Sequence, residues 1–328
     1  MGEMIKDTVA SRSSVLVTGA AGYVGRLVVE ALASDRQEVR TIVATDVRDV
    51  PKAQRLAGVT YERLDITDRE RLRELLEANG VDTLVHLAAV VTPRPGDTRE
   101  MQYAVDVEGT ENVLAACVAA GVGKLVYTSS GAAYGYHADN PPMLREDDSL
   151  RGNEVFAYAW HKRLVEDRLA DYAERHPELE QLVFRVSTVL GASVKNQITA
   201  IFERPVVLGL READTPFCFI WDSDLVECIC RGVHGTWTGT YNLTGDGVMT
   251  LREIAAGMGR RYVALPVNLV KKGLEVLGRV ELTEYGPEQV AFLQHRPVLD
   301  NQKLRRELGY RPSKTSREVF ELYRASRA

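Results

Sequence analysis

Cysteine is scarce in this sequence, with four residues in 328, and no two of them form a Cys-x-x-Cys pair. The four are Cys117, Cys218, Cys228 and Cys230, and all lie within apolar segments. This placement is typical of small buried side chains in a reducing compartment, so we expect a cytoplasmic protein. Cys228-Ile229-Cys230 leaves a metal or redox fragment as the alternative, but we expect no metal site.

Long apolar runs and an excess of basic residues are also missing. No run approaches the roughly 18 residues of a membrane-spanning helix, which argues against a membrane protein. Residues 1–12 are polar and lack the apolar core of a secretory signal, so we expect them to form a flexible tail. The 46 acidic and 41 basic residues give a net charge of −5, which argues against a general nucleic-acid-binding protein.

A glycine-rich segment stands near the start of the chain, in Thr18-Gly19-Ala20-Ala21-Gly22-Tyr23-Val24-Gly25. It follows a short apolar run and opens an amphipathic stretch, which predicts a strand, a turn and a helix. Gly19 permits the tight turn, Gly22 lets a pyrophosphate approach the helix, and Gly25 allows helix and strand to pack closely. The helix N-terminus then presents free N–H groups to the phosphates. We expect a dinucleotide site that includes Tyr23 and Val24.

Apolar runs alternate with helical patterns through the first half of the chain. The runs expected to be strands are residues 14–17, 39–45, 59–64, 81–87, 124–128 and 182–186. The helical patterns cover residues 23–33, 68–78, 98–120 and 155–172. This alternation predicts an α/β fold with a doubly wound parallel sheet of the Rossmann type, whose helices cover both faces.

The alternation loosens beyond residue 187, where prolines separate shorter elements. We assign residues 13–186 to a dinucleotide-binding Rossmann domain and expect residues 217–245 to return to it. Residues 187–216 and 246–328 are then expected to form a smaller C-terminal substrate-binding domain.

Two acidic residues end predicted strands on the cofactor side. Asp46 follows the last glycine of the motif by about twenty residues, where a carboxylate binds the adenosine ribose and repels a 2′-phosphate, so NAD is favoured over NADP. Arg48 beside it would weaken that preference, and a solvated turn residue is the alternative for Asp46. Asp65, with Ile66, is expected to contact the adenine, and its alternative is a cap before the next helix.

A tyrosine and a lysine form the candidate reacting pair. Tyr158 and Lys162 are four residues apart, so on a helix they share one face. A nearby ammonium and the charge of an oxidised nicotinamide would both lower the pKa of the phenol, which could then exchange a proton with a substrate hydroxyl. Thr128-Ser129-Ser130 ends a strand at the ligand-binding edge of the sheet, where a serine would hydrogen-bond the reacting oxygen. The pattern predicts hydride transfer at a carbon bearing oxygen.

On these motifs the chain resembles the extended branch of the short-chain dehydrogenase/reductase superfamily, which includes NAD-dependent sugar-nucleotide epimerases and dehydratases. The matching stretches are residues 17–25, 82–89, 107–114, 127–130 with 134–135, and 158–162, with weaker matches at 219–224, 241–243, 300–304 and 308–312. The resemblance therefore spans nearly the whole chain. It implies NAD as cofactor and a small-molecule substrate.

The resemblance also implies roles for individual residues. Ser130, Tyr158 and Lys162 would be the catalytic set, and Lys162 would also bind the nicotinamide ribose. His86 would be a packing residue at a strand end rather than a general base. Further cofactor contacts would come from Leu87, Ala88, Ala89 and Thr128.

A homodimer is also expected from the resemblance. The helices predicted at residues 98–120 and 155–172 would form a four-helix contact. Close packing there would be allowed by Ala104, Ala116, Ala157 and Ala170.

The chain departs from the family at several positions. Asp106 stands where the family usually has an asparagine that supports the active-site helix. Ser187 lies in the region where the sugar-nucleotide enzymes carry an asparagine, and Asn196 is a possible replacement for it. The segment that usually contains a nucleotide-binding arginine is apolar and aromatic, with Phe217, Phe219 and Trp221. These three side chains suit an apolar ligand, or they belong to the core of a strand.

Other charged residues have a structural and a functional interpretation. Asp222 and Asp224 suggest a metal site, but capping of the following helix is favoured. Three basic residues offer anion contacts in the substrate domain, although surface positions are favoured for them: Lys195, Arg204 and Arg211.

The sequence therefore predicts an NAD-dependent oxidoreductase or epimerase acting at a secondary alcohol or ketone carbon, with a nucleotide-sugar epimerase or dehydratase as one form. The alternative is a dehydrogenase of a more apolar, sterol-like or aromatic, secondary alcohol. A more distant alternative is a regulator that senses a dinucleotide without catalysis, but such proteins usually lose the tyrosine and lysine kept here.

Overall fold

A computed structural model describes residues 13–35, 39–94, 96–279 and 290–327 of the chain. The expected tail at residues 1–12 lies outside these ranges. The main element is a seven-stranded sheet of order β11-β6-β5-β4-β1-β2-β3, and every neighbouring pair is parallel. Its strands are β1 (Ser13–Thr18), β2 (Val39–Asp46), β3 (Thr60–Arg63), β4 (Thr83–His86), β5 (Lys124–Ser130), β6 (Glu180–Val186) and β11 (Gly239–Leu243).

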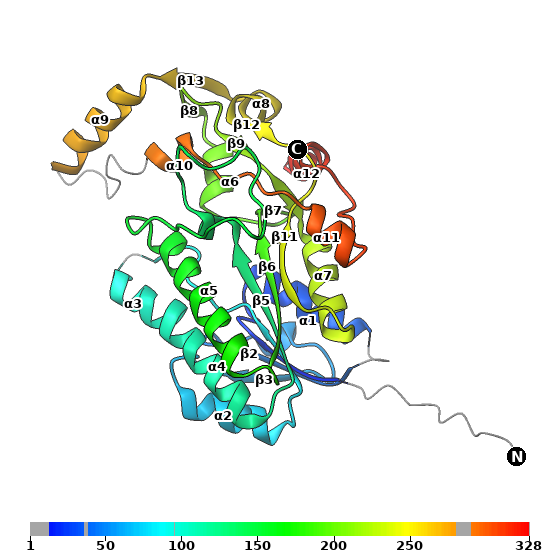
Figure 1. Cartoon of the computed structure of the whole chain (residues 1–328). Coiled ribbons are helices and arrows are strands. Elements are labelled where there is room, and N and C mark those ends of the chain that lie inside the picture. Colours follow the sequence, from blue (N-terminus) through cyan, green and yellow to red (C-terminus); the bar gives the residue numbers. More distant parts are fainter. Residues whose placement is uncertain (1–12, 36–38, 95, 280–289, 328) are drawn as a thin grey trace, which may run out of the picture.

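Helices cover both faces of this sheet (Figure 1). Helices α1 (Tyr23–Ser34) and α7 (Asp222–His234) pack on one face. The other face is covered by α2 (Arg69–Ala78), α4 (Gly109–Ala120) and α5 (Ala157–Arg175). The predicted doubly wound Rossmann-type architecture is therefore confirmed, and β11 extends the sheet as its seventh strand.

The alternation of side chains along the buried strands explains the two layers. In β1, Val15 and Val17 belong to the apolar cluster under α1 and α7, whereas Leu16 belongs to the cluster under α2 and α4. All three are fully buried, because a strand with helices on both faces has no side exposed to water. Such a strand appears in the sequence as a continuous apolar run.

The long helix predicted at residues 98–120 is interrupted. It begins as α3 (Arg99–Tyr103), capped by Thr98, passes through a π-helical turn at Ala104–Glu108, and continues as α4. Gly121 ends it in the left-handed region, at φ +68°, as expected for a helix C-terminus. The π turn buries Asp106, which a regular amphipathic pattern would not predict.

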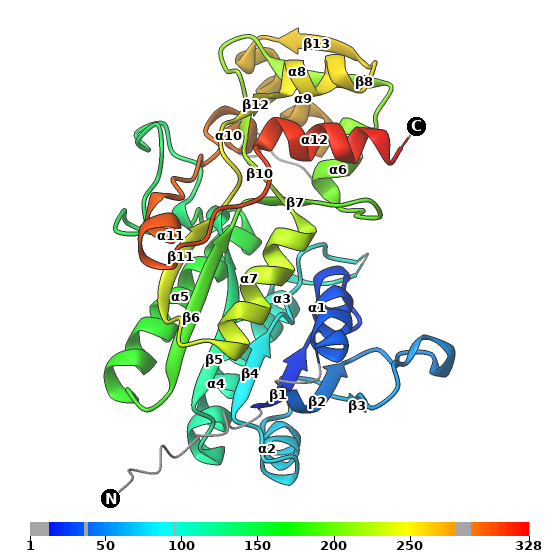
Figure 2. The same ribbon diagram turned by 90° about the vertical axis from the view of Figure 1, so that its right-hand side faces the viewer.

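Most of the remaining elements lie beyond the carboxyl ends of the central strands (Figure 2). Three two-stranded sheets pair β7 (Thr188–Leu190) with β10 (Phe219–Trp221), β9 (Pro216–Phe217) with β12 (Met249–Thr250), and β8 (Val206–Leu210) with β13 (Arg261–Leu265). The helices are α6 (Gln197–Phe202), α8 (Leu251–Gly257), α9 (Val267–Arg279), α10 (Val290–Gln294), α11 (Gln302–Glu307) and α12 (Ser316–Ala325), and short 3-10 turns occur at Lys52–Gln54 and Gly131–Tyr134.

One of the alanines expected at a dimer contact does not face outward. Ala116 is fully buried against the sheet of its own chain, because it lies on the inner face of α4. Ala170 is exposed, and Ala104 and Ala157 are half-buried. The homodimer remains a prediction. Among the helices of the described residues, none combines the length and the apolarity needed to cross a bilayer.

Replacing Gly25 by alanine tests the close packing of α1 on the glycine turn. A Cβ at this position would lie 2.2 Å from the Gly19 carbonyl oxygen and 2.8 Å from Ala20 Cα, and both are backbone atoms that cannot move aside cheaply. We expect Gly25→Ala to lower the free energy of unfolding by about 1–3 kcal/mol, measured by denaturant titration.

Gly273→Ala is the matched control, because among the described residues no atom beyond its own stretch of α9 lies within 4 Å of a Cβ at this position. It should leave stability unchanged or raise it slightly. Equal effects of the two substitutions would contradict the packing argument.

Candidate active site

The glycine turn brings the N-terminus of α1 to the carboxyl edge of the sheet. Gly19 adopts φ +71°, and a Cβ there would lie 2.7 Å from the backbone nitrogen of Ala88. Gly22 is the N-cap residue, and no side chain caps the helix. The N–H groups of the first turn, which begins with Tyr23 and Val24, therefore have no side-chain acceptor and are suited to an anion.

Tyr23 joins this turn to α7. Its hydroxyl donates to Asp222 Oδ2 at 2.5 Å, and burial raises the pKa of Tyr23 well above its usual range, so it remains a donor. Asp224 accepts from the Tyr310 hydroxyl at 2.9 Å and from Ser313. The capping prediction is wrong for both aspartates, because the N-cap is Trp221 and both carboxylates bind side chains that are distant in sequence. Within the described ranges, no group of three or more residues is arranged to hold a metal ion.

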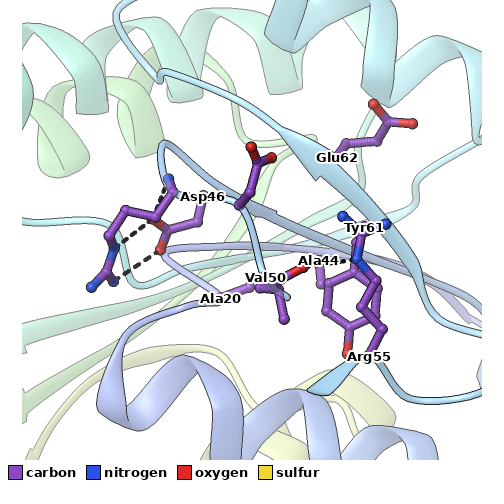
Figure 3. A pocket seen from close by; sticks show the side chains of 9 residues that line it. Ala20, Ala44, Asp46, Val50, Arg55, Tyr61 and Glu62 are labelled. Atoms are coloured by element: carbon purple, nitrogen blue, oxygen red, sulfur yellow. Dashed lines mark hydrogen bonds and ion pairs between the residues drawn. The ribbon is translucent and has the colours of Figure 1, made fainter. Parts of the chain in front are cut away.

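Asp46 lies beside the glycine turn, at the end of β2. Its Oδ2 accepts from the backbone N–H of Ala21 at 3.0 Å, and its Oδ1 accepts from Arg48 N at 3.0 Å and Arg48 Nε at 3.1 Å. Figure 3 shows this carboxylate at a small hollow between β2 and β3. The hollow is lined by Ala20, Ala44, Asp46, Arg48, Asp49, Val50, Arg55, Tyr61 and Glu62. Asp46 is thus held in place at the location where the sequence predicts the ribose.

Asp65 and Ile66 follow β3. Asp65 is exposed, and its Oδ1 accepts from the backbone N–H and the hydroxyl of Thr67 at 2.9 and 2.8 Å. The cap of α2 is Asp68 instead. Ile66 is buried, and a Cβ on Gly109 would lie 2.7 Å from its Cδ1, so its side chain packs on that helix. Asp65 therefore has a turn-forming role, and its contact with adenine remains a prediction.

A buried polar chain connects β1, β4 and α4. The His86 ring lies between Thr18 Oγ1, 2.7 Å from Nδ1, and Thr110 Oγ1, 3.0 Å from Nε2. Thr110 donates its one hydroxyl proton to the Asp106 carbonyl at 2.6 Å, so it can only accept from His86. The proton of the neutral ring is therefore on Nε2, and Nδ1 accepts from Thr18.

This chain also positions the segment after β4. Thr18 Oγ1 accepts from the backbone N–H groups of Leu87 and Ala88 at 3.2 and 3.3 Å. Burial lowers the pKa of His86 to about 3, so the ring is neutral at physiological pH and has no spare proton site. The structure supports the packing role of His86. Because the N–H groups of Leu87 and Ala88 are already bonded within the chain, this segment can flank a cofactor but cannot donate through them.

Ser130, Tyr158 and Lys162 come together at the carboxyl edge of the sheet. Ser130 ends β5, Tyr158 lies in the first turn of α5, and Lys162 follows one turn later. The Lys162 ammonium donates to the Tyr127 hydroxyl at 2.8 Å and to the Thr128 carbonyl at 2.9 Å, and it lies 5.9 Å from the centre of the Tyr158 ring. Lys162 is 5 % exposed, whereas Ser130 and Tyr158 are half-buried. Lys162 is therefore more deeply buried than Ser130 and Tyr158.

Burial dominates the electrostatics of this group. It raises the pKa of Tyr158 to about 12, against the opposing effect of a hydrogen bond with Ser130. It also lowers the pKa of Lys162 to about 8, although Asp106 and Glu166 favour the charged form. Burial therefore raises the pKa of Tyr158, against the expected lowering, and the Lys162 ammonium donates to Tyr127 rather than to Tyr158.

A buried ion pair supports the end of β5. Arg185 on β6 pairs with Glu166 at 2.7 Å, and Glu166 also accepts from the Ser129 hydroxyl. The same guanidinium donates to the Tyr134 hydroxyl at 2.8 Å. Sequence reasoning did not identify this network. One indication was available, because Glu166 lies four residues after Lys162 on the same helix face.

Asp106 lies on the other side of the lysine. Its Oδ1 accepts from the backbone N–H of Val90 at 2.8 Å, and its Oδ2 is 2.9 Å from His161 Nδ1. His161 stands between Tyr158 and Lys162 in sequence and is 1 % exposed. The aspartate found in place of the family's asparagine therefore has a histidine partner, which sequence reasoning did not anticipate.

Arg296, in the C-terminal part of the chain, is half-buried among aromatic side chains. Arg296 donates through Nη2 to Thr188 at 3.3 Å, and its guanidinium lies 4.0 Å from the ring centre of Phe217 and 4.6 Å from that of Phe292. Its Nε and Nη1 are buried and have no hydrogen-bond partner among the described residues. The Phe292 ring contacts Tyr136, which belongs to the same apolar cluster as Tyr158. A cation with unused buried donors is suited to an anionic ligand.

Two of the three aromatic residues suggested for an apolar ligand lie in the protein core. Phe217 and Phe219 are fully buried and pack against Phe202, so they form the core of this region, as the alternative interpretation stated. Trp221 is half-buried. Ser187 has a buried hydroxyl without a hydrogen-bond partner in the described ranges.

The other polar candidates cap a helix or are exposed. The Asn196 side chain caps α6 by accepting from Ile198 and Thr199. The three basic residues proposed as anion contacts are exposed, as favoured from the sequence: Lys195, Arg204 and Arg211.

Comparisons with solved structures agree with this architecture. MoeE5 in complex with UDP-glucose and NAD superimposes with a TM-score of 0.73 over 96 % of this chain and 98 % of the other, at 22 % identity. A UDP-glucose 4-epimerase from Thermotoga maritima with UDP-glucose gives a TM-score of 0.72 over 95 % and 98 %, at 19 % identity. At these identities the likeness concerns the fold.

Sequence comparisons extend over most of the chain. An uncharacterized protein of Mycobacterium bovis is 27 % identical over 314 residues, covering 94 % of this chain and 82 % of the relative. A 3β-hydroxysteroid dehydrogenase/Δ5→4-isomerase of Vaccinia virus is 35 % identical over 155 residues, which cover 46 % of this chain and 43 % of the relative. The model of the NAD dependent epimerase/dehydratase family matches residues 15–223. The chain belongs to this family of NAD-dependent enzymes.

Proposed function

We propose that this protein uses NAD to oxidise a secondary alcohol carbon of a nucleotide sugar, and that it works as an epimerase, dehydratase or dehydrogenase. The observation that carries the proposal is the grouping of Ser130, Tyr158 and Lys162 at the same carboxyl edge of the sheet as the glycine turn, where open α/β sheets bind ligands. We further propose a homodimer located in the cytoplasm.

The residues around the turn fit a dinucleotide. The pyrophosphate would lie on the uncapped N-terminus of α1, at Gly22, Tyr23 and Val24, because no side chain competes for those N–H groups. Asp46 would accept from the adenosine ribose, and Lys162 would donate to the nicotinamide ribose. The other proposed contacts are Gly19, Gly25, Asp65, Ile66, Leu87, Ala88, Ala89, Thr128 and Tyr158. Bound NAD supplies the hydride acceptor.

The side chains of the protein move the proton. Tyr158 as a phenolate takes the proton of the substrate hydroxyl while the carbon loses its hydride and a carbonyl forms. Ser130 donates a hydrogen bond to the same oxygen. Because burial raises the pKa of Tyr158 to about 12, the phenolate needs added positive charge, and both Lys162 and an oxidised nicotinamide would supply it. If the carbonyl compound is held and reduced on its other face, the net reaction is epimerisation.

Arg296 favours an anionic substrate. Two of its donor nitrogens are buried without partners among the described residues, and a phosphate would satisfy them. Two solved structures with the same fold are described as complexes with UDP-glucose. A steroid-like alcohol is the second candidate, and its support is the steroid dehydrogenase relative. Phe217 and Phe219, two of the three aromatic residues that suit such a ligand, lie in the core and are not exposed to it.

Replacing Tyr158 by phenylalanine tests the proton transfer. We expect turnover of a nucleotide-sugar panel to fall by about a hundredfold or more, because the proton acceptor is lost, while the affinity for NAD in calorimetry stays nearly intact. Tyr172→Phe is the control, since Tyr172 lies on the same helix but its hydroxyl donates to Glu111. Full activity of Tyr158→Phe would refute the assignment.

Replacing Arg296 by methionine tests the substrate class. Loss of a charged donor should raise KM for a nucleotide sugar by about tenfold or more and leave KM for an uncharged sterol-like alcohol unchanged. Arg306→Met serves as the control, because Arg306 is exposed on α11. An unchanged KM for every anionic substrate would exclude a phosphate at Arg296.

Replacing Asp46 by asparagine tests the ribose contact. The substitution removes the charge that repels a 2′-phosphate, so the preference for NAD over NADP, measured as a ratio of Kd values, should fall by about tenfold. Asp49 lines the same hollow, and Asp49→Asn should leave the ratio unchanged. If both variants keep the ratio of the natural chain, Asp46 does not contact the ribose.

A further inference from the structure

Tyr23 connects the glycine turn to the C-terminal part of the chain. It is the first residue of α1, so its backbone N–H belongs to the uncapped turn proposed for the pyrophosphate. Its neighbours Val24 and Leu27 pack on the apolar cluster under α1, but the Tyr23 ring packs on a separate one, which we call the C-terminal cluster. Buried members of that cluster include Leu190, Phe202, Phe217, Phe219, Phe320 and Tyr323. Among the apolar side chains of α1 that the structure describes, Tyr23 is the one that reaches it.

The strand pairing explains why the Tyr23 hydroxyl meets two further segments. β7 and β10 run parallel with Leu190 opposite Trp221, so the residues that follow these strands, Gly191 and Asp222, lie next to each other. The Tyr23 hydroxyl donates to Asp222 Oδ2 at 2.5 Å. A Cβ on Gly191 would lie 2.6 Å from Asp222 Cγ and would overlap the Tyr23 hydroxyl, so only glycine fits there without a shift. The start of α1, the end of β7 and the start of α7 therefore meet at three residues, which we call the Tyr23 contact.

The loop that follows Gly191 is also held at its other end. The side chain of Val194 is buried in the C-terminal cluster, and its backbone N–H donates to the Gly191 carbonyl at 3.3 Å. The Val194 carbonyl accepts from Arg327, and Asn196 caps α6 two residues later. The loop at residues 191–196 thus has one end at the Tyr23 contact and the other on elements of the C-terminal part of the chain.

We propose that Tyr23 is a positioning residue of the dinucleotide site, which fixes the pyrophosphate-binding turn against the C-terminal cluster and couples NAD binding to the order of the loop at residues 191–196. The inference rests on the proposed function, since that proposal places the pyrophosphate on this turn. Because both its ring and its hydroxyl are anchored, Tyr23 has little freedom to rotate. A donor that is held in place before binding loses less entropy when the ligand arrives. Coupling is reciprocal, so NAD on the turn would also hold the loop.

Tyr23→Phe removes the hydroxyl and keeps the ring on the C-terminal cluster. We expect the Kd for NAD, measured by calorimetry, to rise by about fivefold to tenfold, because the turn is then less firmly fixed. Tyr323→Phe is the matched control, since Tyr323 belongs to the same cluster and its hydroxyl donates to another carboxylate, Glu203 Oε1, at 2.8 Å. Both substitutions should lower the free energy of unfolding, but Tyr323→Phe should leave the Kd unchanged. Equal Kd values for the natural chain and Tyr23→Phe would overturn the proposal.

A second variant tests the space at the Tyr23 contact. Gly191→Ala keeps the hydroxyl and the carboxylate but places a methyl group against both, so we expect it to raise the Kd for NAD as Tyr23→Phe does. Gly209→Ala is its control, because a Cβ there would also collide with a tyrosine hydroxyl, that of Tyr262, within the β8–β13 pair. The double variant of Gly191→Ala and Tyr23→Phe should bind NAD about as well as either single variant, since both act on one contact. Fully additive effects would contradict a shared contact.

Hydrogen exchange followed by mass spectrometry tests the coupling, beginning with the natural chain. We expect saturating NAD to slow the exchange of backbone amides in residues 191–196 of the natural chain, and to slow it little in Tyr23→Phe saturated with NAD. Strand β13, in the same part of the chain, is the internal reference and should exchange at the same rate with and without NAD. Equal protection of the loop in both proteins would overturn the coupling.

These measurements need NAD but no substrate, which separates the possible failures. If the natural chain binds no NAD, the proposed cofactor site is wrong and this inference is overturned with it. If the natural chain binds NAD and Tyr23→Phe binds it equally well, this inference alone is overturned. An error in the proposed nucleotide-sugar substrate would show in the turnover assays and would leave the NAD affinities as predicted.

Discussion

The structure depends on one buried chain of hydrogen bonds that runs from Thr18 through His86, Thr110 and Asp106 to His161. Each member is almost fully buried, so the hydrogen bonds of the chain are made within the protein and not with water. The chain crosses from β1 to β4, α4 and α5. It thereby sets the glycine turn, the segment after β4 and the catalytic helix in fixed positions relative to one another.

This constraint accounts for the fixed positions of the proposed reacting groups. Lys162 is held by two neutral acceptors below the surface, and the ion pair of Glu166 and Arg185 supports the end of β5 beside Ser130. Buried charges of this kind reduce the reorganisation that the reaction requires. The cost is a pKa of Tyr158 that burial raises to about 12.

Much of this was predictable from sequence, for local reasons. The strands lie between helices on both faces, so they appear as continuous apolar runs, and the glycine turn and the spacing of Tyr158 and Lys162 are short-range patterns. The partner of Asp106 was not predictable, because the π turn and the pairing with His161 join residues 55 positions apart. Arg296 was missed for the same reason, since its importance comes from the apolar side chains that enclose it. Asp222 and Asp224 at the start of α7 fit a capping pattern in the sequence, because only the fold brings their distant partners, Tyr23 and Tyr310, to them.

The most direct test of the account begins with incubation of the purified protein with NAD and removal of the unbound ligand. The protein is then denatured, and the released dinucleotide is identified by mass spectrometry. The account predicts about one NAD per chain, because the uncapped α1 terminus and Asp46 together select it. A protein that releases no dinucleotide under these conditions, and takes up none at higher NAD concentration, would contradict it.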